Sequence, residues 1–362
     1  MSRDFLKTLM NCSEKAANIA RKCRADEHLL ALLVEEKSAD EANPRFIKDF
    51  KTLADVLIQE TIRYEVGKLF PEMVGNINGE ESATFTNTLG ESVTIAIGEN
   101  AQETAACLEK VLNQNKLAAE LLAEEVHREV EYIGSGPTMP MAPSDLNYNK
   151  IGIWIDPIDA TAEYIAGETV FTNFPGITST GLDCVTILLG VFSIQNGYPL
   201  AGIINQPFGE KIGENKYASK VYWGVSLGSF SANNIPPPAP LPKKIAVLSG
   251  SENPEVVERI KSLGYEIAVT AGAGHKALKV ILGEANLYLL SKSSTFKWDT
   301  CAPQAILQSL GAGIFDFKKS IKTERLQPIM YDQKAIRCNL GGLVAVRDLK
   351  LGMEVLKVLA AD

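Results

Sequence analysis

Two carboxylates stand three residues apart in Asp156-Pro157-Ile158-Asp159-Ala160-Thr161, directly after the apolar run at 151–155. The run is typical of a strand, and the fixed φ of Pro157 predicts that the chain leaves it in a turn before a helix opens. Hard oxygen ligands beside the N–H groups of a helix start would suit a divalent cation bridged to a phosphate. A strand-ending turn with an acidic helix cap explains the same hexapeptide equally well. Other segments are therefore needed to choose between the two interpretations.

Three further acids fall where strands end or helices begin. Glu80 lies in an acidic turn, Asp55 near the start of a helix expected over 45–70, and Asp299 just before a helix expected over 302–310. Alone, each has an ordinary explanation as a solvated turn residue or as an acid favoured by a helix dipole. Together the acidic sites can converge on one cleft, and two-metal phosphoesterases use such a set of carboxylates. The set predicts a divalent-metal site for a phosphate ester.

The composition limits what the protein can bind. Among 362 residues, 44 are acidic and 36 basic, and the net charge of −8 argues against nucleic acid and against a polybasic membrane patch. A phosphate substrate would therefore need bound cations. No run reaches the roughly 18 apolar residues of a membrane span, and the start of the chain lacks an apolar signal segment. The six cysteines have no zinc-site spacing, so we expect reduced thiols in a cytoplasmic protein.

Hydrophobic periodicity predicts two unlike halves joined by the proline-rich segment 235–242. The first half is expected to contain helices at 13–24, 45–70 and 101–131 and strands at 151–155, 184–194 and 200–204, the last two joined by a turn at Asn196-Gly197. The second is expected to alternate, with strands at 244–248, 266–270, 286–290, 313–317 and 342–346 and helices at 254–263, 275–284, 302–310 and 350–361. We expect an α/β (α+β) fold with a domain at 1–240 that carries most metal ligands and a domain at 241–362 that completes the substrate site.

Two motif matches receive a different interpretation. Residues 224–228 have the Gly-x-Ser-x-Gly form of a hydrolase nucleophile, but the helix and the ordered Asp and His that this motif requires do not follow. The run Gly272-Ala273-Gly274-His275-Lys276-Ala277 is similar to the start of a dinucleotide-binding turn, yet no acid for the ribose follows the next strand. An anion-binding helix start explains this run better, with Lys276 as a point charge for a substrate phosphate.

Four segments, taken with the acidic motifs, resemble a known family, the metal-dependent and lithium-sensitive phosphatases that include inositol monophosphatase. They are similar above all to its inositol polyphosphate 1-phosphatase branch. The segments are 13–20, 49–56, 202–208 and 295–299. The resemblance runs from about residue 13 to 317. It implies a layered α-β-α-β-α sandwich of the inositol monophosphatase and sugar phosphatase type, with mixed sheets in both halves and the active site between them.

The resemblance also implies residue roles. Two or three Mg²⁺ ions would be held by Asp55, Glu80, Asp156, Asp159, Asp299 and the main-chain carbonyl of Ile158. The substrate would contact Asp159, Ala160, Thr161, Ser251, Gly272, His275, Lys276 and Asp299. The catalytic set would be Asp55, Glu80 and Thr161, with Glu80 and Thr161 orienting a metal-activated water that attacks phosphorus directly. Lithium would inhibit the reaction.

The chain departs from the family pattern at three positions. Ala160 stands where Gly or Ser is usual, Asn253 follows Ser251-Glu252 where the pattern has a lysine, and His275 replaces a tyrosine. We expect the substrates to be inositol 1,4-bisphosphate and inositol 1,3,4-trisphosphate, hydrolysed at the 1-phosphate by a monomer. Two alternatives stay open: a 3′(2′),5′-bisphosphate nucleotidase of the same superfamily, and a non-catalytic inositol-phosphate-binding protein.

Overall fold

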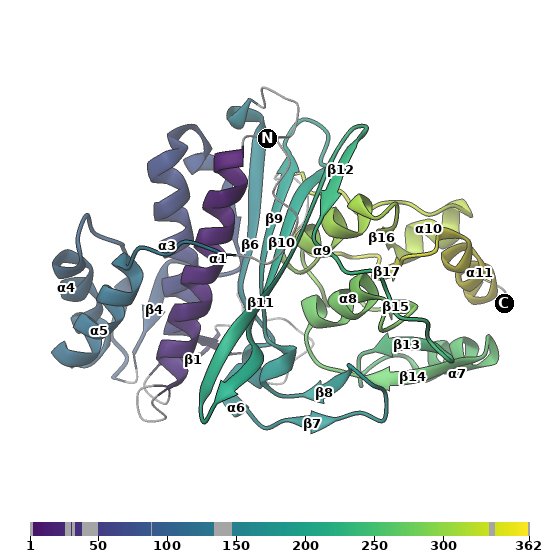
Figure 1. Ribbon diagram of the computed structural model, residues 1–362, viewed down its shortest axis with the longest axis horizontal. Helices are drawn as coiled ribbons and strands as arrows, with labels where there is room; N and C mark the ends of the chain where they lie inside the picture. The colour runs from purple at the N-terminus through teal and green to yellow at the C-terminus, as the bar shows by residue number, and fades with distance from the viewer. Residues whose placement is uncertain are drawn as a thin grey trace.

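Two mixed β-sheets and three layers of helices form the molecule (Figure 1). The computed structural model describes residues 3–25, 30, 33–37, 50–87, 89–133, 147–332 and 337–360. Helices α1 and α3 cover the outer face of the first sheet, α8 and α9 lie between the two sheets, and α7, α10 and α11 cover the second sheet. This arrangement confirms the layered α-β-α-β-α fold.

The first sheet has six strands in the order β12-β11-β10-β9-β6-β3. In that order they span Phe230–Asn233, Lys216–Leu227, Pro199–Gly213, Thr186–Ser193, Ile151–Asp159 and Ile77–Gly79. All neighbours are antiparallel except β3 and β6, which are parallel. The second sheet has five strands in the order β14-β13-β15-β17-β16. They span Tyr265–Val269, Lys244–Leu248, Leu287–Leu290, Leu343–Val346 and Gly313–Asp316, and β13 is parallel to both of its neighbours.

The helices differ in length and in the layer that they occupy. The outer N-terminal layer contains α1 (Arg3–Arg24), α3 (Leu53–Leu69), α4 (Ala101–Val111) and α5 (Lys116–His127). The middle and far layers contain α8 (Ala273–Leu282), α9 (Lys297–Ser309), α7 (Pro254–Ser262), α10 (Phe317–Thr323) and α11 (Leu349–Ala360), and the short α6 (Thr161–Ala166) follows β6. Three small hairpins pair β1 (Val34–Glu36) with β2 (Phe50–Thr52), β4 (Thr84–Thr86) with β5 (Ser92–Thr94), and β7 (Val170–Phe171) with β8 (Thr178–Thr180). The 3₁₀ turns are Pro71–Asn76, Tyr148–Lys150 and Leu182–Cys184.

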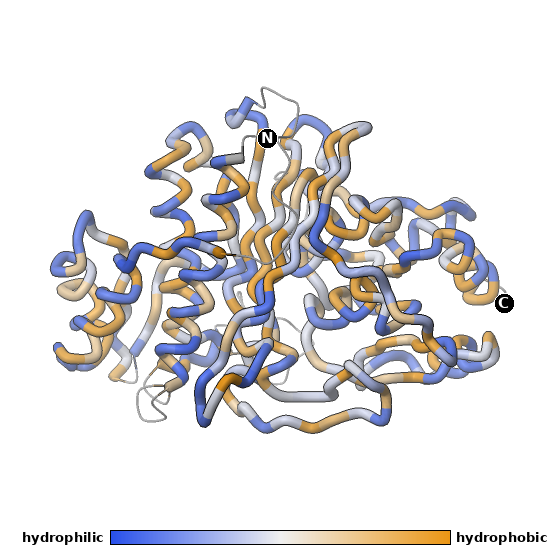
Figure 2. Tube along the Cα trace, viewed as in Figure 1, coloured by the Kyte–Doolittle hydropathy of each residue, from blue (hydrophilic) through white to orange (hydrophobic). Residues whose placement is uncertain are grey.

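The strands are apolar on both faces because helices cover both sides. In β13, Ile245 and Val247 belong to the core between the sheets, whereas Ala246 and Leu248 belong to the core under α7, α10 and α11. Strand β6 divides in the same way, with Trp154 facing the middle layer. Figure 2 shows hydrophobic residues recurring along these strands. Such a two-sided pattern is what a sheet covered on both faces requires.

Several predicted boundaries were wrong. The strand predicted at 151–155 continues through Pro157 to Asp159, because a register shift against β9 accommodates the residue without an N–H. Helix α9 begins at Lys297 instead of 302, since the Asp299 side chain caps the N–H of Phe296 and permits an earlier start.

Other differences concern elements that the sequence pattern joined or missed. The helix predicted at 13–24 begins earlier, at Arg3, and the helix predicted at 101–131 is two helices. The helix predicted at 45–70 begins at Leu53, and residues 45–49 lie outside the described ranges. Strands β11 and β12, helix α10 and the extension of β10 to Gly213 were not predicted. The exposed ends of β10 and β11 carry lysines and glutamates, which resemble loop composition.

Two sequence expectations can be compared with these coordinates. All six cysteines lie in described ranges and are free thiols. Within the part of the chain that the structure describes, no helix combines the length and apolar character needed to cross a membrane. The domain division at 1–240 and 241–362 stays a prediction. The middle helices pack on both sheets and form one core with them.

Helix α9 lies directly on a row of glycines that crosses three strands. Gly190, Gly202 and Gly224 are neighbours in register on β9, β10 and β11. A Cβ added at Gly202 would lie 2.1 Å from the carbonyl oxygen of Ala302 in α9. The glycines therefore permit a close approach that side chains would prevent. This approach fixes the start of α9, and with it Asp299, against the first sheet.

We predict that Gly202→Ala destabilises the protein by about 1–3 kcal/mol, because the added methyl overpacks the contact with the α9 backbone. Chemical denaturation monitored by circular dichroism measures the effect. Gly75→Ala is the matched control, since a Cβ there meets nothing within 4 Å. Equal stability of the two variants would contradict the close packing of α9.

Candidate metal centre

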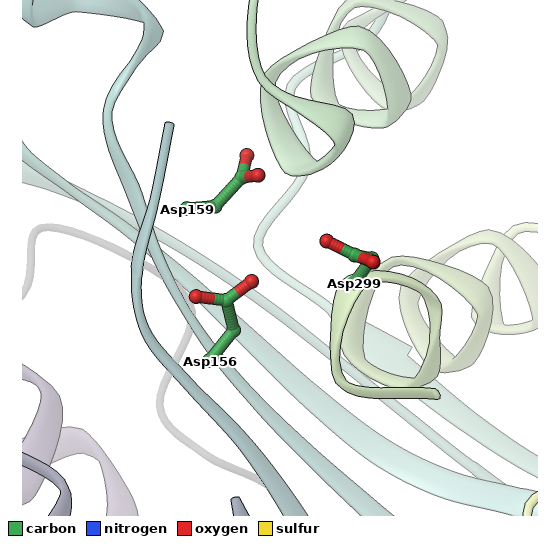
Figure 3. A group of neighbouring side chains, drawn as sticks. All are labelled: Asp156, Asp159 and Asp299. Carbon is green, nitrogen blue, oxygen red and sulfur yellow. The ribbon is translucent and has the colours of Figure 1, made fainter. Parts of the chain in front are cut away.

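Three aspartates converge where β6 meets the first turn of α9. Asp156 and Asp159 come from β6 and Asp299 from α9, and one carboxylate oxygen of each lies within 4.8 Å of the others. Figure 3 shows the three side chains directed toward a common space. Asp156 and Asp159 are buried and Asp299 is partly buried. The structure thus brings together residues 143 positions apart that the sequence predicted as ligands.

The electrostatics of this cluster favour a bound cation. Burial, and then repulsion from Glu80, Asp159 and Asp299, raises the pKa of Asp156 well above its usual range. Burial and the charges of Asp159 and Glu80 raise the pKa of Asp299 in the same way. The Asp156 Oδ1 atom is buried and has no hydrogen-bond partner among the described residues. Hard oxygen donors that repel one another, one of them without a hydrogen-bond partner, fit a divalent ion such as Mg²⁺.

Asp55 lies beside the cluster at the start of α3. Its carboxylate accepts hydrogen bonds from the Thr52 N–H at 2.7 Å and from Thr52 Oγ1 at 2.5 Å. Burial raises the pKa of Asp55 to about 7, although the bonds from Thr52 oppose this shift. Thr161 Oγ1 donates to the Ile158 carbonyl at 3.0 Å and lies 3.5 Å from Asp55 Oδ1. Asp55, Ile158 and Thr161, all predicted as site residues, therefore meet at one place.

Glu80 reaches the centre from the end of β3. Its N–H donates to the Ile155 carbonyl of β6 at 3.1 Å, which continues the pairing of the two strands. Its carboxylate forms an ion pair with the Lys37 amine at 2.6 Å, and the same amine lies 2.7 Å from Glu81. Lys37 is buried. Lys37 was not predicted, since a lysine after two glutamates gives no signal that distinguishes it from a solvated lysine.

Ala160 and the start of α6 border the cluster on another side. Ala160 has a φ of 69°, in the left-handed region that favours glycine. The chain turns here from β6 into α6, which begins at Thr161; a helix after this turn was predicted, without a first residue. The contact of Ala160 and Thr161 with a phosphate stays a prediction.

The start of α8 holds Asp159. The N–H groups of Ala273 and Gly274 donate to the Asp159 carboxylate at 3.1 and 2.8 Å, and Thr186 Oγ1 donates to it at 3.2 Å. Burial raises the pKa of Asp159, and the positive charge of Lys276 and these N–H groups oppose the rise. The predicted anion-binding helix start thus binds an anion of the protein itself. Neither α8 nor Thr186 was predicted to support a metal ligand.

The predicted substrate residues of α8 lie inside the protein. His275 has no exposed surface, and its Nδ1 lies 3.0 Å from Thr270 Oγ1. Burial, and then the charges of Lys279 and Lys276, lowers the pKa of His275 well below its usual range, so the ring is neutral. The Lys276 amine donates to the Thr270 carbonyl at 3.0 Å. A substrate role for Gly272, His275 and Lys276 stays a prediction; the side chains of His275 and Lys276 are buried, and Gly272 is half-buried at the start of the helix.

A separate cavity of about 550 Å³ lies near the far end of α8. It is lined by the β7–β8 hairpin and by residues of β10, β11 and α8, and it includes none of the predicted metal ligands. The metal centre between β6 and α9 is therefore separate from this cavity.

The raised pKa values predict how the stability of the metal-free protein changes with pH. Burial raises the pKa of Asp55 to about 7 in the folded protein from about 4 in the unfolded chain, so its contribution to stability is present below about pH 4 and is lost as the pH rises through about 7. We expect Mg²⁺ to raise the melting temperature more at pH 8 than at pH 5.5, because the metal replaces these protons. Differential scanning fluorimetry, with and without Mg²⁺, measures the melting temperature at each pH. Asp156→Asn should reduce both the loss of stability at high pH and the stabilisation by Mg²⁺. An equal Mg²⁺ effect at the two pH values, unchanged in this variant, would contradict the site.

Comparisons with known proteins agree with this geometry. The sequence profile of the inositol monophosphatase family matches residues 60–345. Inositol polyphosphate 1-phosphatase of Bos taurus is 42% identical, with 96% of this chain and 94% of that protein covered. The 3′(2′),5′-bisphosphate nucleotidase 1 of Rattus norvegicus is 26% identical, with coverage of 93% and 91%.

A solved structure shares the fold. An IMPase of Thermotoga maritima superposes with a TM-score of 0.55 at 16% identity, covering 98% of this chain and 96% of that one. At this identity the likeness concerns the fold alone. The family profile and the bovine relative extend over most of the sequence, and the charges of Glu80, Asp159, Asp299 and Asp55 all act on Asp156. The chain belongs to the inositol monophosphatase family.

Proposed function

We propose that this protein is a magnesium-dependent phosphatase that removes the 1-phosphate from inositol 1,4-bisphosphate and inositol 1,3,4-trisphosphate. The observation that carries the proposal is the convergence of Asp156, Asp159 and Asp299 within 4.8 Å, from two elements distant in sequence. The choice of substrate is supported by the 42% identity with a bovine inositol polyphosphate 1-phosphatase over nearly the whole of both chains.

Different residues of the site would bind the metal ions and orient the attacking water. Magnesium at this centre would polarise phosphoryl oxygens and lower the pKa of water. The three aspartates would hold the ions, with Asp55, Glu80 and the Ile158 carbonyl beside them. Thr161 is oriented by its hydrogen bond to Ile158 and lies at the edge of the centre, where it and Glu80 could direct the attacking water in line with the phosphorus.

The two alternatives are less well supported. The bisphosphate nucleotidase of Rattus norvegicus is 26% identical, well below the 42% of the bovine inositol polyphosphate 1-phosphatase, over a similar share of the chain. A non-catalytic binding protein would be expected to have lost a metal carboxylate, whereas all five acids are present and the charges of the other four act on Asp156. We also propose that the enzyme acts as a cytoplasmic monomer, an expectation with which its free cysteines are compatible.

We predict that Asp156→Asn and Asp299→Asn each lower turnover of inositol 1,4-bisphosphate by several orders of magnitude, because each removes a metal ligand from the reacting centre. Phosphate release at saturating Mg²⁺ measures this. Glu210→Gln, an exposed change on β10, is the control and should leave turnover unchanged. Near-normal turnover in either aspartate variant would contradict the metal assignment. Preferential hydrolysis of adenosine 3′,5′-bisphosphate by the wild type would support the nucleotidase instead.

Lithium should inhibit the enzyme in an uncompetitive or nearly uncompetitive manner. A small monovalent cation can take one Mg²⁺ position while phosphate stays bound, but it carries too little charge to complete the cycle. Initial rates at several substrate and LiCl concentrations, with KCl added to equal ionic strength as the control, measure the effect. Activity that is unaffected by millimolar LiCl at low Mg²⁺ would contradict the prediction.

A further inference from the structure

The loops after β13 and β15 meet at a position where open α/β sheets bind ligands. From β13 the chain passes through α7 to β14 on one side, and then through α8 to β15 on the other side of β13. Helices α7 and α8 lie on opposite faces of the sheet. The carboxyl ends of β13 and β15 therefore form a topological switch point, and ligands bind in the crevice outside such strand ends. The residues at this crevice are Ser249–Ser251 and Ser291–Lys292.

Glu252 joins these two loops through hydrogen bonds. It is almost completely buried, and its carboxylate accepts hydrogen bonds from the N–H of Ser291 at 2.9 Å and from the Ser291 hydroxyl. The same carboxylate accepts from the N–H of Asn253 at 2.7 Å. A buried acid with three donors holds its neighbours in a fixed geometry. It thereby fixes the chain at Ser251, which adjoins Glu252, and at Lys292, which adjoins Ser291.

Lys292 is exposed at this crevice and keeps its positive charge available. Its amine donates to the Ser251 carbonyl, a neutral partner, and no described carboxylate forms an ion pair with it. The other lysines nearby differ. Lys276 is buried and donates to Thr270, and Lys279 pairs with Glu284 at 2.9 Å. Lys292 is thus the cation of this group that an incoming anion can reach.

The crevice lies close to the metal centre along the chain. Lys292 is four residues before Phe296, whose N–H donates to the Asp299 carboxylate at 2.5 Å. Four extended residues span at most about 14 Å, and the flexible side chain of a lysine can shorten the remaining gap. The exposed Ser293 lies between them, and its hydroxyl donates to the Leu340 carbonyl at 2.8 Å. The chain therefore keeps Lys292 within about 14 Å of Phe296, on the loop that leads from β15 into the first turn of α9, where Asp299 lies.

We infer that Lys292, positioned by Glu252, binds the substrate phosphate that is not cleaved and makes the enzyme select inositol bisphosphates over monophosphates. The inference rests on the proposed function. Lys292 acts as a point charge that holds the distal phosphate, with the Ser251 hydroxyl on the same loop pair as a neutral donor. No bond to this phosphate forms or breaks.

The test compares Lys292→Met with the wild type on inositol 1,4-bisphosphate and inositol 1-phosphate. Loss of a charged contact should raise KM for the bisphosphate about tenfold or more and leave kcat within about twofold. KM for the monophosphate should not change; if its turnover is too slow, its inhibition constant as a competitor replaces KM. Lys292→Arg should restore most of the affinity. Lys318→Met, an exposed lysine on α10, is the matched control and should alter neither substrate.

Further readouts separate a direct contact from a structural effect. The KM of Lys292→Met for the bisphosphate should depend less on salt than that of the wild type, since one screened charge pair is gone. Glu252→Gln should raise the same KM by a smaller factor, and its melting temperature is measured alongside. An unchanged bisphosphate KM in Lys292→Met, or an equal rise for both substrates, overturns the inference while the proposed function stands. A wild type that hydrolyses neither inositol ester overturns both.

Discussion

Mutual repulsion among buried carboxylates is the constraint on which the rest of this structure depends. Asp156, Asp159 and Asp299 are brought within 4.8 Å of one another in a place that water reaches poorly, and the charges of Glu80 and Asp55 add to the repulsion. Such an arrangement is unfavourable unless a cation or protons offset it. The fold therefore has to hold the acids rigidly from outside the cluster, so that the site is ready for an ion before the ion arrives.

The supports for the acids come from different elements, which explains the layered architecture. Thr52 holds Asp55, the N–H groups at the start of α8 hold Asp159, the Phe296 N–H holds Asp299, and Lys37 pairs with Glu80. Asp156 differs, because one of its oxygens has no such support among the described residues. A helix layer between two sheets is what allows α8 and α9 to approach β6 together. The row of glycines under α9 sets how close that approach can be.

The sequence could predict that these acids converge because each lies at a strand end or helix start, where local patterns are informative, and three of them do lie together. It also predicted the alternating elements beyond residue 240, since their apolar runs and breaks are regular. It did not predict that β6 passes through Pro157, because the shift that makes this possible depends on β9. Nor could it predict that α8 would bind Asp159 or that Lys37 would reach Glu80, since these contacts join residues 115 and 43 positions apart. Such contacts exist only once the layers are assembled.

The central claim is that the three converging aspartates bind a divalent metal. Crystals of the protein grown with Mn²⁺ in place of Mg²⁺ test it most directly, through an anomalous difference map recorded near the manganese edge. The account predicts a strong peak between the carboxylates of Asp156, Asp159 and Asp299, and loss of that peak in crystals of Asp156→Asn. A map in which Mn²⁺ binds elsewhere on the protein and leaves no peak among these three side chains would contradict it.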